Sequence, residues 1–198
     1  MIRLGFLASH RGSNMQCVID ACKDGRLAAS PAVVISNNRD SGALRRAVEE
    51  GIPHHHLSTT HHPETDTLDA AIRDALQNNN VDIVVLAGYM KKLGRLTLTA
   101  FAGKVLNIHP ALLPKYGGRG MYGMHVHEAV LAAGETQSGV TVHVVDDEYD
   151  RGPILAQQSV PVKPGDTPTS LAQRVLALEH TLYVDTLGKI VSGTILLD

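Results

Sequence analysis

Strand-like and helix-like segments alternate along the first half of the chain. Runs at residues 2–8, 32–36, 52–57 and 81–88 predict strands, and the segments between them place apolar residues at helical spacing. The run VDIVVLAG is apolar throughout, which is typical of a strand buried on both faces of a parallel sheet. Because parallel strands are joined by right-handed crossovers, this order predicts a Rossmann-like, doubly wound α/β fold.

The pattern changes in the second half of the chain. A strand is predicted at 105–109, and residues 139–162 read as two strands joined by an acidic loop. We therefore expect the mostly parallel sheet to finish with antiparallel strands toward the C-terminus. A long helix from about residue 169 and a short TILL segment close the chain. No repeat or linker divides the 198 residues, so a single domain over residues 1–198 is expected.

The composition limits the kinds of partner. The chain has 18 Lys and Arg against 20 Asp and Glu, and this formal charge of -2 gives no electrostatic case for binding nucleic acid or a membrane. No apolar run approaches membrane-spanning length, and the first residues lack the features of a signal peptide, so a cytoplasmic protein is expected. Cys17 and Cys22 form neither a disulfide framework nor a zinc set and are interpreted as buried thiols. The sequence leaves open whether the protein is a monomer or a homodimer.

An asparagine and a histidine lie two residues apart in VLNIHP, at the polar end of a predicted strand. Residues two apart in a strand point to the same face, so Asn107 and His109 would present an amide and a titratable imidazole to one pocket. Pro110 and the glycine-rich segment after it would end the strand and leave that pocket open.

Three polar segments follow predicted strands: RGSNM, AGYMKKL and NIHP. In open α/β sheets, ligands bind beyond the carboxyl ends of the parallel strands, so these segments are expected to converge on one site. Gly12, Ser13 and Asn14 enter a helix N-terminus whose free amides favour an anion such as phosphate. A small polar turn is also the ordinary way to begin a helix.

The histidines do not form a recognisable metal site. Five of them cluster around a short strand and a loop without helical pairs at ligand spacing: His54, His55, His56, His61 and His62. His125 and His127 flank the start of a helix, where a solvated or locally hydrogen-bonded role is expected. In VTVHVV, His143 lies on the face opposite Val140, Val142 and Val144 and therefore either faces the site or serves as a satisfied structural histidine.

An acidic loop joins the last two predicted strands. Asp146, Asp147 and Glu148 are interpreted as a solvated turn, as most runs of acids are. Asp150 precedes the corner RGP, which would fix the direction of its carboxylate. An oriented carboxylate near an imidazole makes an acid/base pair, and we expect it to raise the proton affinity of the imidazole in NIHP.

Together these segments resemble the formyltransferase family that uses 10-formyltetrahydrofolate. NIHPALLP and VTVHVVDDEYDRGPIL carry the resemblance, which runs from GFLASHRGSNMQ to RVLALEHTLY. The resemblance implies that the formyl group of 10-formyltetrahydrofolate, the co-substrate, is transferred to the primary amine of glycinamide ribonucleotide in purine (IMP) biosynthesis. It further implies direct attack of the amine through a tetrahedral intermediate, with small-molecule substrates and no metal.

The resemblance also implies roles for individual residues. The catalytic residues would be Asn107, His109 and Asp150. The nucleotide would be held by Gly12, Ser13, Asn14, His62 and Glu179. The folate would be bound by Tyr89, Met90, Lys91, Lys92, Leu93, Asn107, His143, Asp146, Asp147, Glu148, Tyr149 and Asp150.

Three positions depart from the family pattern. His62 stands where many relatives have a phosphate-binding arginine, and it supplies a charge only when protonated. Lys91 falls where arginine is common, and Lys92 falls where an apolar residue is usual. Two other functions stay open. A formyltetrahydrofolate hydrolase would direct water, rather than the amine of the nucleotide, to the formyl carbon. A non-catalytic folate or nucleotide binding module would bind its ligand without turnover.

Overall fold

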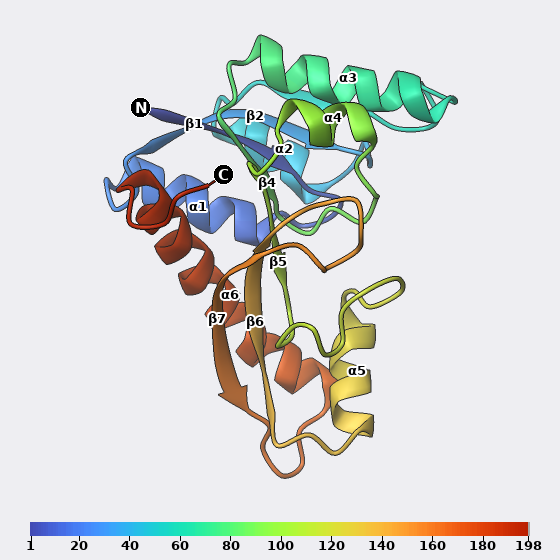
Figure 1. The fold of residues 1–198 in the computed structure, drawn as a ribbon, viewed down its shortest axis with the longest axis vertical. Coiled ribbons are helices and arrows are strands. Elements are labelled where there is room, and N and C mark those ends of the chain that lie inside the picture. Colours follow the sequence, from blue (N-terminus) through green and yellow to red (C-terminus); the bar gives the residue numbers. More distant parts are fainter. Residues whose placement is uncertain (198) are drawn as a thin grey trace.

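The computed structural model describes residues 1–197, in which seven strands form one sheet in the order β3-β2-β1-β4-β5-β6-β7 (Figure 1). The strands are β1 Ile2–Leu7, β2 Ala29–Ser36, β3 His54–His56, β4 Ile83–Leu86, β5 Val105–His109, β6 Gln137–Val144 and β7 Ile154–Pro161. Strands β1 to β5 are parallel to one another, whereas β6 is antiparallel to β5 and β7 is antiparallel to β6. The predicted fold class is confirmed.

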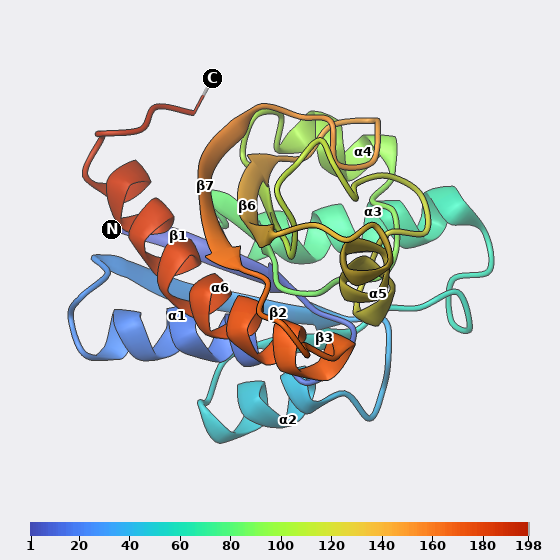
Figure 2. The same ribbon diagram turned by 90° about the horizontal axis from the view of Figure 1, so that it is seen from below.

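Helices cover both faces of the sheet. They are α1 Ser13–Lys23, α2 Gly42–Glu49, α3 Thr65–Asn78, α4 Arg95–Ala100, α5 Met124–Ala132 and α6 Pro168–Val191. Figure 2 shows α3 and α4 on one side of the sheet and α1, α2 and α6 on the other. Successive residues of β4 divide between the two cores: Ile83 and Val85 pack in the α1/α6 core, and Val84 and Leu86 pack in the α3/α4 core. This burial on both faces explains the unbroken apolar run at that strand.

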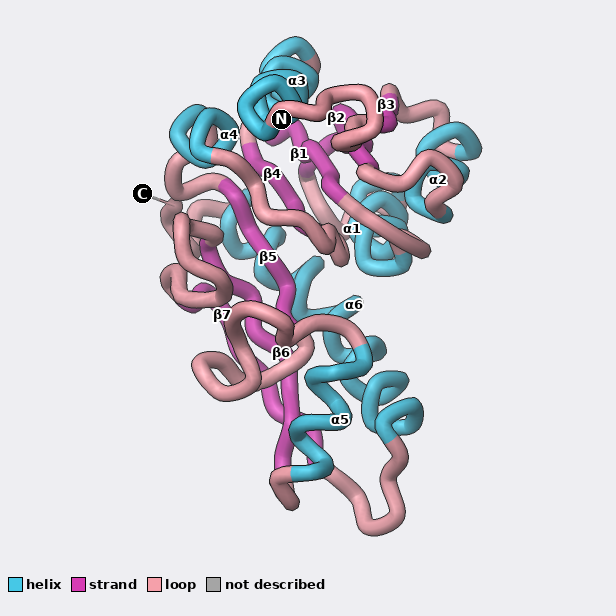
Figure 3. The backbone as a smooth tube through the Cα atoms, turned by 90° about the vertical axis from the view of Figure 1, so that its right-hand side faces the viewer, coloured by secondary structure: helices cyan, strands magenta, loops and turns pink. Residues whose placement is uncertain are grey.

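Side-chain alternation sets the two faces of β5 and β6. Their even-numbered residues pack in the core that contains α6: Leu106, Ile108, Val140 and Val142. The odd-numbered residues therefore share the opposite face. Asn107 is the cross-strand partner of His143, and both lie on the same face as His109. The predicted common face of the asparagine and histidine in NIHP is thus observed, and Figure 3 shows loops gathered beside this part of the sheet.

The strand order changes direction between β1 and β4. The helix that follows β1 covers one face, and the helix that follows β4 covers the other, which leaves a crevice at the carboxyl ends of these strands. Tyr183 of α6 is buried under the sheet, with 1% of its surface exposed. Its hydroxyl is 3.1 Å from the carbonyl oxygen of Leu86 and 3.0 Å from that of Leu106, so it ties α6 to β4 and β5.

Some details differ from the sequence-based expectation. Strand β2 begins at Ala29 rather than at residue 32 and includes Pro31, which is tolerated because β3 pairs only with residues 34–36 of β2. Cys17 and Cys22 are half-buried rather than fully buried, and burial raises the pKa of Cys22 to about 11. None of the helices within residues 1–197 is both long and apolar enough to cross a membrane.

Candidate active site

A cavity of about 800 Å³ opens at the carboxyl ends of β1, β4 and β5. Its walls come from residues 10–14, 86–93, 107–110 and 118–124, from the segment 143–150 without Val144 and Asp147, and from Leu98, His127 and α6. It gathers most of the residues implicated by the sequence: Gly12, Ser13, Asn14, Tyr89, Met90, Lys91, Lys92, Leu93, Asn107, His109, His143, Asp146, Glu148, Tyr149, Asp150 and Glu179. The three polar segments therefore meet in one cavity, as expected.

Two of the residues implicated by the sequence are not in the lining of this cavity. Asp147 is exposed in the loop after β6, as expected for a residue of a solvated acidic turn. His62 is half-buried in the loop between β3 and α3, where its backbone N–H donates to the carbonyl of Ser58 at 3.0 Å. Because β3 is the edge strand and β2 separates it from β1, this loop lies beside the cavity rather than in its wall.

His109 is buried, with 3% of its surface exposed. Its Nε2 donates to the carbonyl oxygen of Tyr116 at 2.7 Å, and its Nδ1 lies 3.7 Å from Oδ2 of Asp150. Burial lowers the pKa of His109, while Asp150 and the Tyr116 carbonyl raise it, and the net pKa is below the usual value. Asp150 thus raises the proton affinity of His109, as expected, but the effect of burial is larger.

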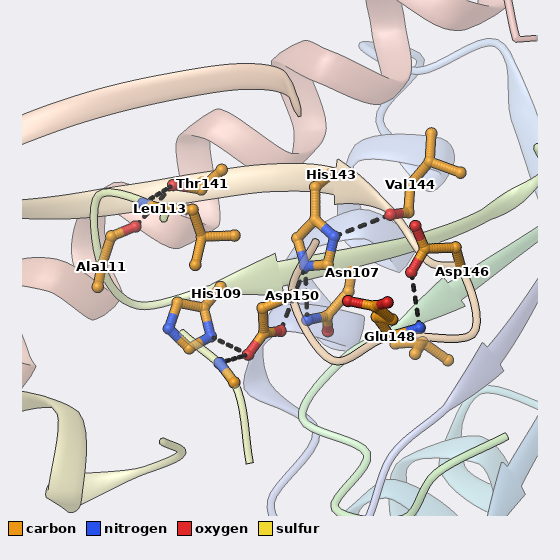
Figure 4. Close-up of polar contacts among 12 residues, drawn as sticks. Asn107, His109, Ala111, Leu113, Thr141, His143, Val144, Asp146, Glu148 and Asp150 are labelled. Carbon is orange, nitrogen blue, oxygen red and sulfur yellow. Dashed lines mark hydrogen bonds and ion pairs between the residues drawn. The ribbon is translucent and has the colours of Figure 1, made fainter. Parts of the chain in front are cut away.

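Asp150 is held in one orientation by the loop around it (Figure 4). Its φ of 57° lies in the left-handed region. Its Oδ2 accepts from the N–H of Gly118 at 2.9 Å, and its Oδ1 lies 3.5 Å from Nε2 of His143. Burial raises the pKa of Asp150, but His143, His109 and the Gly118 amide together lower it below its usual value. The carboxylate is therefore ionised at neutral pH.

Asn107 and His143 orient each other. Nδ1 of His143 is 2.9 Å from the carbonyl oxygen of Val144, which can only accept, so Nδ1 carries a hydrogen. In the neutral ring, Nε2 then accepts from the amide nitrogen of Asn107 at 3.1 Å. This leaves the second amide hydrogen of Asn107 for a ligand. His143 thus combines both interpretations of the sequence, since it lines the cavity and its hydrogen bonds are satisfied.

At another wall of the cavity, Asn14 and Glu179 form a buried pair. The amide of Asn14 donates to Oε2 of Glu179 at 2.5 Å, while Oδ1 of Asn14 has no partner. Burial raises the pKa of Glu179 to about 7. Helix α1 begins after Gly12, whose φ is 69°, without a side-chain cap, whereas Ser41 caps α2. The first amides of α1 therefore remain available to an anion.

The segment after β4 is joined to the turn after β1. The N–H of Met90 donates to Oγ of Ser9 at 2.7 Å, and the N–H of Ser9 donates to the carbonyl of Gly88 at 3.0 Å. Burial raises the pKa of Tyr89 to about 12. Across the cavity mouth, Nζ of Lys92 lies 5.7 Å from the ring centre of Tyr149, within the range of a cation–π contact. Met90 and Tyr149 are exposed and give this mouth an apolar rim.

His127 lines the cavity, although the sequence indicated a solvated or locally bonded residue. It is 5% exposed, its Nδ1 is enclosed without a hydrogen-bond partner, and burial lowers its pKa. Its helical spacing to the buried Val130, three residues on, is the signal that could have indicated an inward direction. His125 is exposed, with its Nδ1 3.4 Å from Glu128, as expected. Within residues 1–197, no group of three or more His, Cys, Asp or Glu side chains is arranged to hold a metal ion.

Several known proteins are similar to this chain in sequence and in fold. The formyl transferase family model matches residues 2–187. The chloroplastic phosphoribosylglycinamide formyltransferase of Arabidopsis thaliana is 42% identical over 189 residues, which are 95% of this chain and 65% of that protein. The chain thus spans just under two thirds of the length of that relative. The Escherichia coli (strain K12) phosphoribosylglycinamide formyltransferase is 38% identical over 177 residues, 89% of this chain and 81% of that protein.

The solved structures agree with the sequence comparison. Glycinamide ribonucleotide transformylase 1 from Symbiobacterium toebii has a TM-score of 0.93 and 39% identity to this chain, and the match covers 100% of this chain and 91% of that one. The match of the family model, the sequence identities and the shared fold agree with the motifs NIHPALLP and VTVHVVDDEYDRGPIL. The chain therefore belongs to the formyl transferase family.

Proposed function

We propose that this protein transfers the formyl group of 10-formyltetrahydrofolate to the primary amine of glycinamide ribonucleotide. One observation carries the proposal: a single cavity joins an uncapped helix N-terminus, suited to a phosphate, to a cluster of Asn107, Asp150 and the buried His109. We further propose that the chain acts as one domain on small molecules in the cytoplasm. Two cores packed on one sheet support the single domain.

The folate would occupy the part of the cavity between residues 89–93 and the loop at 146–150. A flat ring system suits a cavity with an apolar rim and a few fixed polar groups. The enclosed Nδ1 of His127 has no partner within residues 1–197, which fits a site that a polar ligand completes.

In the proposed reaction, the neutral amine of the nucleotide attacks the formyl carbon, and the formyl oxygen becomes negative. The second amide hydrogen of Asn107 would donate to this oxygen, in an orientation fixed by His143. Nε2 of His109 already donates to a carbonyl, so Nδ1 is the ring nitrogen that would take the proton lost by the attacking amine. Asp150, 3.7 Å away, would stabilise the resulting imidazolium. The proton then passes to the departing folate nitrogen.

The decisive test is loss of 10-formyltetrahydrofolate that depends on added glycinamide ribonucleotide, with identification of the formylated nucleotide as product. Equal loss without the nucleotide, together with free formate, would instead show hydrolysis. Tight binding of both ligands without loss of either would show a binding module. Either result would overturn the proposed transfer.

A further inference from the structure

The wall of the cavity at the start of α1 is suited to a phosphorylated sugar. The amides of Ser13 and Asn14 have no side-chain cap, so they can donate to phosphate oxygens. Asn14 is only 9% exposed, yet its Oδ1 has no partner and can accept a hydrogen bond from a hydroxyl. These two features are independent of each other. Neither supplies the full charge that a phosphate dianion calls for.

Arg11 is placed to supply that charge. It immediately precedes Gly12, and it lines both the main cavity and a second hollow of about 560 Å³ beside the ends of β1 and β2. The residue is exposed. Within residues 1–197, its guanidinium makes neither an ion pair nor a hydrogen bond that meets ordinary distance limits. Its charge is therefore uncommitted.

The backbone of Arg11 is fixed by α2. Its carbonyl oxygen accepts from Nε of Arg46 at 3.0 Å, and the carbonyl of His10 accepts from the N–H of Ala43 at 3.0 Å. The start of α2 also approaches closely, since a Cβ added to Gly42 would lie 2.9 Å from the Arg11 carbonyl oxygen. A free guanidinium thus extends from an anchored backbone, which lowers the entropy cost of pairing it with a ligand.

The other cations of this region are less suited to the task. Arg39 lines only the second hollow. Arg46 is engaged with the Arg11 carbonyl and with Oε1 of Gln16. His62, which the sequence indicated, is in the wall of neither hollow.

We propose that Arg11 pairs with the phosphate of the nucleotide at the start of α1 and supplies the permanent positive charge there. This inference rests on the proposed function for the identity of the nucleotide. An arginine stays protonated at every physiological pH and can bind two phosphate oxygens at once. Phosphate binding at this wall would therefore not follow the titration of a histidine, in contrast to a site built around His62.

The test measures binding by calorimetry with two probes, ribose 5-phosphate and glycinamide ribonucleotide. Arg11→Gln should weaken both roughly ten- to a hundredfold, the range for a lost charged hydrogen bond. Arg11→Lys should restore part of the loss, because it keeps the charge without the fork. Arg39→Gln is the matched control, and it should change both affinities less than twofold. Binding of a folate analogue should be the same in all three variants.

Several results would overturn the inference. These are an Arg11→Gln variant within twofold of wild type, an equal loss in Arg39→Gln, or a loss seen in His62→Ala instead. A wild-type protein that binds neither probe would also overturn it. Failure of the proposed function is distinguishable: ribose 5-phosphate would still bind in an Arg11-dependent way, while glycinamide ribonucleotide would not be formylated. In turnover assays of Arg11→Gln, KM should rise while kcat is retained, because the phosphate contact would stabilise the ground state and the transition state equally.

Discussion

Replacing Glu179 by glutamine should remove a defined pH dependence from the stability of the protein. Glu179 is 8% exposed, and burial raises its pKa from 4.5 to about 7. The folded chain therefore holds this proton more tightly than the unfolded chain does. The stabilising contribution is complete below pH 4.5 and is lost as the pH rises through about 7. A neutral amide in this place keeps the shape of the side chain and has no proton to lose.

The size of the effect follows from the two pKa values. At about 1.4 kcal/mol per pKa unit, the full contribution is roughly 3 kcal/mol. Between pH 5 and pH 8, integration gives roughly 2.5 kcal/mol. The free energy of unfolding of the wild type should fall by this amount relative to Glu179→Gln over that interval. The two free energies of unfolding are compared with each other because other groups, such as His109 and His127, titrate equally in both proteins and cancel in the difference.

Urea denaturation followed by circular dichroism at pH 5, 6, 7 and 8 would measure this difference. Glu49→Gln is the matched control, because Glu49 is an exposed glutamate at the end of α2 and its substitution should leave the wild-type pH dependence unchanged. Parallel stability curves for wild type and Glu179→Gln would refute the reasoning. So would a wild type that gains stability relative to the variant as the pH rises.

Three further predictions concern the chemistry, the phosphate and the loop. His109→Ala and Asp150→Asn should each lower turnover roughly a hundredfold to ten-thousandfold with both ligands still bound, and steady-state kinetics of the double variant should show less than the product of the two losses. Multiplicative losses would mean that the two residues act independently. Ser13→Asp should weaken nucleotide binding through repulsion of the phosphate while folate binding persists, and calorimetry with each ligand would contradict this if both losses were equal. Gly152→Ala should cost about 1–3 kcal/mol or more, because its Cβ would lie 1.9 Å from the carbonyl oxygen of Val144, and an unchanged Tm would count against that contact.

Local sequence patterns predicted the features that depend on chain periodicity. Alternation in VLNIHP and VTVHVV placed Asn107, His109 and His143 correctly on their faces, because the period of a strand is set by the backbone alone. The buried run at β4 likewise indicated a central parallel strand. The meeting of three polar segments in one cavity followed from the topology of open α/β sheets.

Long-range packing determined what the sequence did not reveal. The net lowering of the His109 pKa is a balance in which burial and His143 outweigh Asp150 and the Tyr116 carbonyl, and the sequence shows the carboxylate but not the depth of burial. The Tyr116 carbonyl and the Gly118 amide are backbone groups of an irregular loop, so no residue type indicates them. The position of His62 depends on the path of the loop after an edge strand, and sequence spacing does not fix that path.

The antiparallel pairing of β5 with β6 has a consequence for how sites of this kind can diversify. Asn107 and His143 face each other because of the register of two adjacent strands, so an insertion of one residue within either strand would turn one of them away. Residues 118–124, by contrast, line the same cavity from a segment outside the sheet and carry no part of that register. Changes in residues 119–124 can alter the shape of the cavity, while Asn107, His109 and His143 inherit their geometry from the sheet. Gly118 is the exception, because its N–H holds the carboxylate of Asp150. The wall of the cavity and the three polar side chains carried by the sheet can therefore change separately.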